Sequence, residues 1–253
     1  MTRRPLMAGN WKMFKTIPEA VDLVQKLKPL IAHHNDREIL VCPPFTALMA
    51  VSQAAQGSSI VVGAQNMNDH LNGAYTGEVA PFMLKDAGAS FVLIGHSERR
   101  QYYGETDASI QRKTALALEQ GLSPVVCVGE TLQEREEGKT NAVVERQIEA
   151  LRGLTTVQVS SVVVAYEPVW AIGTGKTATP GQAQDVHKFI RQKLNALFGS
   201  ASESLRILYG GSMKPDNVDQ LMAQPDIDGG LVGGASLKAD DFARIVGFQS
   251  LKS

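Results

Sequence analysis

The chain has 253 residues, of which 43% are hydrophobic and 20% are charged, and its formal net charge at pH 7 is −1. This balance does not indicate an acidic tail or a polyanion-binding surface, and the lone basic pair Arg99-Arg100 is too small to bind nucleic acid. We find no signal peptide and no apolar stretch that could span a bilayer, and Cys42 and Cys127 make no disulfide framework, so we expect a cytoplasmic protein without a membrane partner.

Eight short apolar runs recur along the chain, at residues 6–9, 39–42, 60–63, 91–94, 125–128, 162–165, 207–209 and 231–233. They are continuous rather than alternating, which is typical of parallel strands buried on both faces. Helical signals lie between the runs. They are the spacing of Ala20, Val24, Leu27 and Ile31 after Thr16, a helix from about Asp107 to Gln120 that ends at Gly121, and the capping box Thr179-Pro180-Gly181-Gln182.

Strand and helix alternate eight times without a linker, which favours a closed barrel over an open doubly wound sheet. The first run is not followed by a G-x-G-x-x-G motif, which weakens the dinucleotide-binding alternative. We therefore expect an α/β fold in which residues 1–253 form one (β/α)8 barrel domain with eight parallel strands. Active sites of such barrels lie where strands end and the following loops begin.

Glu167 follows the sixth run after Tyr166, and it is followed by Pro168 and a glycine-rich loop that carries Trp170 and Ile172. Apolar residues at the tip of such a loop indicate that the loop closes over a neighbouring part of the protein surface and excludes water from it. A carboxylate that the loop cuts off from water is a stronger base, because burial disfavours its charged form. Glu167 is therefore a candidate catalytic base.

The last two runs are followed by Gly210-Gly211-Ser212 and by Gly233-Gly234-Ala235-Ser236. Glycines let backbone N–H groups approach an anion, and a helix that starts after Gly234 would add its dipole. These segments predict a phosphate site, and the alternative is that they are tight turns that need positive φ angles.

Polar side chains also follow the first and fourth runs. Lys12 could neutralise a phosphate or a developing enolate, and the alternative is that it is a solvated surface lysine. The side chains of Asn10 and Lys12 would point in the same direction if the chain between them stays extended. If a helix starts near Ser97, its dipole keeps His96 neutral, although a buried structural histidine is the alternative. The spacing of the histidines gives no metal site. Glu98 and Arg99 could be salt-bridged supports, and for Glu98 a role in the site stays open.

Together these groups suit proton abstraction next to a carbonyl in a small phosphorylated substrate. Glu167 takes the proton, while His96 and Lys12 stabilise the enediolate oxygen. The closing loop excludes water and prevents loss of the phosphate.

Five segments resemble motifs of the triosephosphate isomerase family, and they occur along the chain in the order of that family. They are Gly9-Asn10-Trp11-Lys12-Met13, Gly95-His96-Ser97-Glu98-Arg99-Arg100, the segment from Ala165 to Lys176, Tyr209-Gly210-Gly211-Ser212 and Val232-Gly233-Gly234-Ala235-Ser236. The resemblance implies a TIM barrel that interconverts dihydroxyacetone phosphate and D-glyceraldehyde 3-phosphate in glycolysis and gluconeogenesis. It implies neither a metal nor an organic cofactor.

The resemblance also implies a role for each matching residue. Glu167 becomes the base, His96 the neutral electrophile, and Asn10 and Lys12 catalytic groups that also bind substrate. Glu98 supports Lys12. The phosphate is bound by backbone N–H groups of Gly173, Ser212, Gly233 and Gly234.

The resemblance further implies a homodimer through the loop from Gln65 to Glu78, in which Thr76 reaches the partner's active site and supports Asn10 and Lys12 there. One departure is Phe14-Lys15, where many members of the family carry Asn-Gly. That difference affects packing near the dimer contact rather than the chemistry.

Two alternatives remain at the level of the sequence. Another phosphate-binding barrel enzyme, an epimerase or aldolase, would need metal ligands at strand ends or a Schiff-base lysine within a strand, and the eight runs contain no lysine. A non-catalytic scaffold or adhesin of the same fold should lack a catalytic residue or the loop. Lys12, His96, Glu167 and Lys176 are all present.

Overall fold

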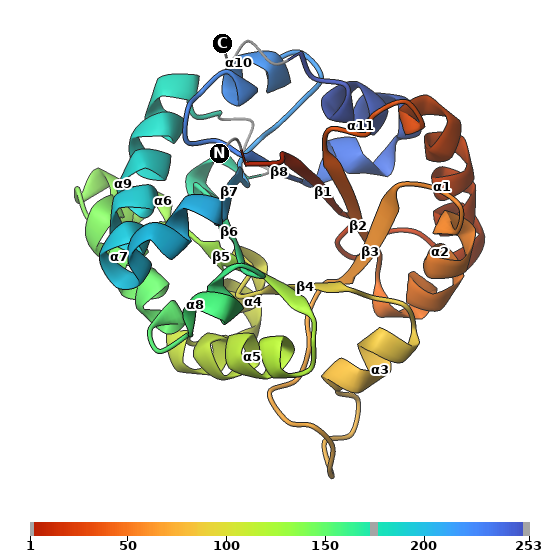
Figure 1. The fold of residues 1–253 in the computed structure, drawn as a ribbon, viewed down its shortest axis with the longest axis horizontal. Helices are drawn as coiled ribbons and strands as arrows, with labels where there is room; N and C mark the ends of the chain where they lie inside the picture. Colours follow the sequence, from red (N-terminus) through yellow and green to blue (C-terminus); the bar gives the residue numbers. More distant parts are fainter. Residues whose placement is uncertain (1–2, 173–176, 250–253) are drawn as a thin grey trace.

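The computed structural model describes residues 3–172 and 177–249, and these residues form a closed barrel of parallel strands surrounded by helices (Figure 1). The strands follow one another around the barrel in chain order. They are β1 (Leu6–Asn10), β2 (Glu38–Cys42), β3 (Ile60–Ala64), β4 (Phe91–Ile94), β5 (Ser123–Val128), β6 (Val163–Tyr166), β7 (Arg206–Tyr209) and β8 (Gly229–Val232). The predicted (β/α)8 barrel is therefore confirmed.

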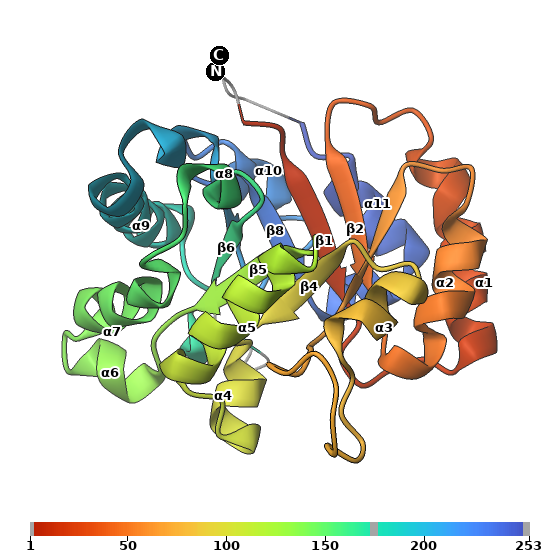
Figure 2. The same cartoon turned by 60° about the horizontal axis from the view of Figure 1, so that its bottom comes forward.

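Helices connect the strands and cover the outside of the barrel (Figures 1 and 2). The α-helices are α1 (Ile17–Ile31), α2 (Leu48–Ala55), α3 (Pro81–Asp86), α4 (Ser97–Tyr103), α5 (Asp107–Glu119), α6 (Leu132–Glu136), α7 (Thr140–Ile148), α8 (Thr156–Val159), α9 (Pro180–Phe198), α10 (Val218–Met222) and α11 (Ala239–Val246). Short 3-10 turns are η1 (Phe45–Ala47), η2 (Glu149–Leu151), η3 (Val169–Ala171), η4 (Gly199–Ser204) and η5 (Gly234–Leu237).

The helix signals are confirmed at three places. Helix α1 covers the predicted apolar positions, and α5 ends beside Gly121, whose φ of 71° is the left-handed conformation of a helix-terminating glycine. Thr179 caps α9 by accepting a hydrogen bond from Gln182 N–H. The helix expected directly after Gly234 is wrong in detail, because η5 is a four-residue 3-10 turn and α11 begins only at Ala239.

β4 coincides with its apolar run, and the other strand ends lie within two residues of theirs. β5 and β8 each begin two residues early, and β8 begins at Gly229 rather than at Leu231. Gly229 and Gly230 are fully paired with β1, but glycine carries no apolar side chain for the pattern to detect.

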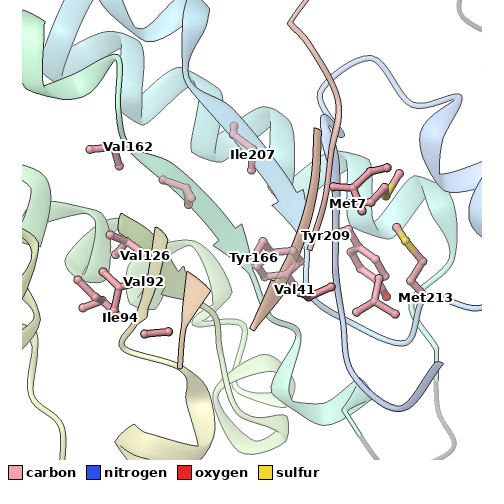
Figure 3. Close-up of a cluster of buried hydrophobic side chains, with 14 of the residues drawn as sticks. Met7, Val41, Val92, Ile94, Val126, Val162, Tyr166, Ile207, Tyr209 and Met213 are labelled. Carbon is pink, nitrogen blue, oxygen red and sulfur yellow. The ribbon is translucent and has the colours of Figure 1, made fainter. Parts of the chain in front are cut away.

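Alternate residues of each strand point to opposite sides of the barrel wall. Leu6 and Ala8 of β1 belong to a buried cluster inside the barrel, whereas Met7 packs in the layer between barrel and helices (Figure 3). Cys42 and Cys127 are free thiols buried inside, as expected from their strand positions. Because the interior is filled, the barrel is a rigid support and not a pore.

The segment between β3 and α3 extends away from the barrel at the carboxyl ends of the strands (Figure 2). It contains Thr76, which is exposed, and exposes large parts of Leu71 and Tyr75. No helix in the described part of the chain is both long and apolar enough to cross a membrane.

Candidate active site

A cavity of about 340 Å³ opens at the carboxyl ends of the barrel strands. Most of the site residues predicted from the sequence lie together in its wall, namely Asn10, Lys12, His96, Glu167, Ser212, Gly233 and Gly234. They come from five different strand ends and are separated by up to 224 positions in the chain (234 minus 10). Gly173 and Lys176 lie outside the described residues.

Glu167 directly follows β6 and is almost completely buried, with 2% of its surface exposed. Its backbone N–H donates to Val128 O at 2.7 Å, which fixes it beside the end of β5. Carboxylate Oε2 accepts a hydrogen bond from Ser97 N–H at 2.9 Å, and Oε1 lies 2.8 Å from His96 Nε2. Glu167 therefore links three neighbouring strand ends.

The ionisation of Glu167 differs from the sequence-based expectation. Burial raises the pKa of its carboxyl, but the adjacent His96 and the Ser97 N–H together outweigh burial, so the pKa lies below its ordinary value. The burial is confirmed. The expected raising of the pKa by burial is present but is exceeded in this arrangement, because the chain supplies two partners for the carboxylate.

His96 is the N-cap of α4, so the predicted helix start at Ser97 is confirmed. Its Nδ1 accepts a hydrogen bond from Glu98 N–H at 3.2 Å, which leaves the ring proton on Nε2, the nitrogen that faces Glu167. This arrangement fits a neutral imidazole. Burial lowers the pKa of His96, but the Glu167 carboxylate more than offsets it and raises the pKa. Whether the His96 imidazole is neutral therefore depends on how close the Glu167 carboxylate lies to it.

Lys12 has a φ of 53°, a left-handed conformation that is uncommon for a residue with a side chain. The condition of an extended chain, on which the shared direction of Asn10 and Lys12 rested, is therefore not met at Lys12. Instead, Asn10 Oδ1 accepts from Lys12 N–H at 3.0 Å, and Gln65 Nε2 donates to Lys12 O at 2.8 Å. This turn still directs both side chains to the cavity. Residues held in such strained conformations cluster at functional sites.

Glu98 lies beside Lys12, with 2.5 Å between its Oε1 and Lys12 Nζ. The contact supports the role that the family resemblance implies for Glu98. Arg99, in contrast, pairs with Glu105 at 2.8 Å, as expected for a structural salt bridge. Gln65 was named only as the start of the dimer loop, and its hydrogen bond to Lys12 O has no sequence signal beyond its position directly after β3.

The opposite wall of the cavity is formed by the two glycine segments. None of Gly210, Gly211, Gly233 and Gly234 has a positive φ, so the alternative that they serve turns of that kind does not hold. At Gly210 the reason for glycine is space, since a Cβ there would lie 2.9 Å from Glu167 Cγ. The loops thus present backbone to the cavity, as an anion site requires.

Glu130 lies two residues after the fifth apolar run. It is fully buried and accepts hydrogen bonds from Tyr166 Oη, Trp170 Nε1 and Arg135 Nη1, at 3.0 to 3.2 Å. Its backbone oxygen accepts from Val169 N–H at 3.1 Å. Glu130 therefore anchors η3, the first turn of the predicted closing loop.

A larger cavity of about 990 Å³ is also lined by Glu167. Glu167 and Ile172 line both cavities, but Asn10, Lys12, His96 and the glycine segments line only the smaller one. The smaller cavity is therefore the candidate active site, since chemistry depends on convergent groups and not on volume. The described residues contain no group of three or more His, Cys, Asp or Glu side chains that could hold a metal ion.

Comparisons with known proteins agree with this geometry. The family model of triosephosphate isomerase matches residues 5–249. The triosephosphate isomerase of Moorella thermoacetica is 58% identical over 247 residues, which cover 97% of this chain and 99% of that protein. The triosephosphate isomerase of Herpetosiphon aurantiacus is 57% identical over 249 residues, which cover 98% of this chain and 100% of that protein. The similarity therefore includes the loops of the cavity as well as the barrel.

Proposed function

The chain belongs to the triosephosphate isomerase family and interconverts dihydroxyacetone phosphate and D-glyceraldehyde 3-phosphate, and we propose that the 340 Å³ cavity is where it does so. Glu167, His96, Lys12 and Asn10 are the catalytic residues of this proposal. The observation that carries it is the 2.8 Å approach of His96 Nε2 to Glu167 Oε1 in a cavity that Lys12 also lines. A base and a hydrogen-bond donor thus flank one small space.

Glu167 removes a proton from the carbon next to the carbonyl of the bound triose. The electrons of that C–H bond form an enediolate. The isomer forms when the proton returns to the former carbonyl carbon and the hydroxyl proton of the neighbouring carbon moves to the former carbonyl oxygen. In the structure Oε2 accepts a hydrogen bond from Ser97 N–H, and Oε1 lies 2.8 Å from His96 Nε2. The substrate oxygen replaces Glu167 at His96 Nε2, and loss of this contact stabilises the carboxylate less, which makes it a stronger base.

His96 and Lys12 stabilise the negative charge on the enediolate oxygens. The neutral imidazole donates from Nε2, and the hydrogen bond from Glu98 N–H to Nδ1 keeps the ring in that tautomer. Lys12 supplies a positive charge that Glu98 holds in place. Asn10 fixes the Lys12 turn through its side-chain oxygen and also contacts the substrate. Such preorganised donors supply a large part of the rate enhancement of many enzymes.

The phosphate binds at the glycine segments on the opposite wall. Ser212, Gly233 and Gly234 offer backbone N–H groups there, and Gly173 is proposed to complete the set although it lies outside the described residues. A Cβ at Gly233 would lie 3.4 Å from Lys12 Cε, so the lysine stem also reaches this end of the cavity. One cation can thereby serve both the phosphate and the enediolate.

We also propose a homodimer through the loop from Gln65 to Glu78, with Thr76 reaching the partner's Asn10 and Lys12. The support is the amount of apolar surface near the site. Met13 is 91% exposed, Phe14 is 56% exposed, and Leu71 and Tyr75 are exposed on the loop itself. Exposed apolar surface of this extent is typical of interaction sites.

Two smaller proposals follow from the sequence. Residues 1–253 form a single domain, which the closure of the barrel between β1 and β8 supports. A cytoplasmic location is proposed because Cys42 and Cys127 are unpaired and buried, as is usual in a reducing compartment.

Replacement of Glu167 by glutamine tests the proposed site. Glutamine keeps the shape of the side chain but cannot accept the substrate proton, so turnover in a coupled assay should fall by about 10²- to 10⁴-fold. Glu136→Gln is the matched control, because Glu136 is exposed on α6 and should leave turnover unchanged. A folded Glu167→Gln protein with the turnover of the unmodified enzyme would refute the assignment of the base.

A further inference from the structure

The basic pair noted in the sequence contains one arginine without a role in the proposed mechanism. Arg99 pairs with Glu105, but Arg100 points inward, and only 17% of its side chain is exposed. Arg100 lies on α4, the helix whose N-cap is His96 and whose first residue donates to Glu167. Its guanidinium is therefore close to the catalytic groups without lining the cavity that holds them.

The guanidinium of Arg100 makes three hydrogen bonds, each from a different nitrogen. Nε donates to Gly95 O at 2.9 Å, Nη2 donates to Cys127 O at 3.1 Å, and Nη1 donates to Asp107 Oδ1 at 2.5 Å. The three acceptors come from the end of β4, from β5 and from the start of α5. A planar fork with several fixed donors is what such a three-way contact requires.

These contacts lie where the pairing between β4 and β5 stops. The last pair in register is Ile94 with Val126, so Gly95 and Cys127 would form the next one. Gly95 instead leaves the strand with a φ of 73°, and Arg100 binds the two carbonyl oxygens in place of the interrupted ladder. A Cβ at Gly95 would lie 2.6 Å from Ile110 Cδ1, which shows that α5 is packed directly against this corner.

The contacts of Arg100 with Gly95 and Cys127 set the distance between His96 and Glu167, the two side chains proposed to act on the same substrate. His96 directly follows Gly95, and the backbone of Glu167 is hydrogen-bonded to Val128, which directly follows Cys127. Displacement of Gly95 relative to Cys127 would therefore move His96 and Ser97 N–H relative to Glu167. Displacements of about 1 Å in an active site can reduce the rate about a hundredfold.

We propose that Arg100 is a positioning residue, which holds the ends of β4 and β5 together and so fixes His96 and Ser97 against Glu167. The proposal rests on the catalytic roles given above to His96 and Glu167. It predicts that loss of the fork weakens transition-state stabilisation but not phosphate binding, because the glycine segments belong to β7 and β8 on another side of the barrel.

Two substitutions and a matched control test the proposal. Arg100→Lys keeps the positive charge but donates from a single nitrogen, and Arg100→Gln removes the charge as well. Arg146→Gln is the control. Arg146 Nε also pairs with Asp107, at 3.1 Å from Oδ2, but the strand carbonyl oxygens of Gly95 and Cys127 accept from Arg100 instead. If pairing with Asp107 were all that mattered, the control would behave like the Arg100 variants.

We expect kcat to fall roughly ten- to a hundredfold in both Arg100 variants and to stay unchanged in Arg146→Gln. Inhibition by inorganic phosphate should be unchanged in all three, whereas a phosphorylated hydroxamate that mimics the enediolate should bind more weakly to the Arg100 variants alone. A merely structural role would weaken both inhibitors alike. Thermal unfolding identifies a variant that does not fold. If Arg100→Gln does not fold, the kinetics of Arg100→Lys test the proposal.

Wild-type kcat in a folded Arg100→Lys protein would overturn the proposal, as would an equal loss in Arg146→Gln or parallel weakening of both inhibitors. Failure of the proposed site would look different. In that case Glu167→Gln would keep its turnover, whatever Arg100 does. An inactive Glu167→Gln together with a fully active Arg100→Lys would reject the positioning role alone.

Discussion

Gly210 separates the phosphate end of the cavity from Glu167, and its replacement by alanine is expected to impair catalysis in a defined way. The added Cβ would lie 2.9 Å from Glu167 Cγ and 3.1 Å from Tyr166 O, whereas ordinary contacts begin at 3.4 Å. Because φ at Gly210 is not in the left-handed region, the backbone itself accepts alanine without strain. The overlap with Glu167 is therefore the dominant effect.

The magnitude follows from the size of that overlap. Relief of the contact with Glu167 requires a shift of 0.5 Å, the difference between 3.4 and 2.9 Å. If a displacement of about 1 Å costs about a hundredfold in rate, half of that costs about tenfold, or about 1.4 kcal/mol in activation free energy. We expect Gly210→Ala to reduce kcat by about this factor with little change in KM, because the substituent meets the base and not the phosphate.

Two other glycines serve as comparisons in the same coupled assay. A Cβ at Gly181, near the start of α9, or at Gly234 meets no heavy atom within 4 Å. Gly181→Ala should leave all kinetic constants unchanged, and Gly234→Ala should raise KM rather than lower kcat, because it lies in the proposed phosphate site. The reasoning is refuted if Gly210→Ala has the wild-type kcat, or if its loss appears only in KM.

Two further predictions concern pH and assembly. The lowered pKa of Glu167 means that its ionised carboxylate, held by His96 and Ser97 N–H, stabilises the fold at pH values above the ordinary carboxyl pKa of 4.5, and that this contribution is lost as pH falls below that value. In urea titrations between pH 6 and pH 3, the free energy of unfolding should therefore fall more steeply for the wild type than for Glu167→Gln, and equal slopes would contradict the pairing. Dilution that dissociates the proposed dimer should reduce specific activity, because Thr76 would leave the partner's site, and full activity in a monomer demonstrated by sedimentation would reject that role.

The barrel could be predicted from the sequence because its strands are buried on both faces. Runs such as Val162-Val163-Val164-Ala165 are continuously apolar for that reason, and only glycine positions such as Gly229 escaped the pattern. The site residues could be located for a related reason, since a polar residue two positions after such a run lies at the carboxyl end of the barrel, as Glu167 and His96 do.

The remaining features depend on distances between residues far apart in the chain. The left-handed turn at Lys12 is held by Gln65, which lies 53 positions away. The direction of the Glu167 pKa shift is set by His96 and Ser97 rather than by burial. Arg100 was visible only as half of a basic pair, because two of its three acceptors are the backbone oxygens of Gly95 and Cys127, and a backbone acceptor leaves no signal in the sequence.

The measurement that tests the central claim most directly is deuterium uptake from D2O into the triose phosphates, followed by NMR. Proton transfer through Glu167 predicts that the wild type incorporates deuterium at the carbon next to the carbonyl, and that a folded Glu167→Gln protein does so roughly 10²- to 10⁴-fold more slowly. Incorporation by Glu167→Gln at the wild-type rate would contradict the account.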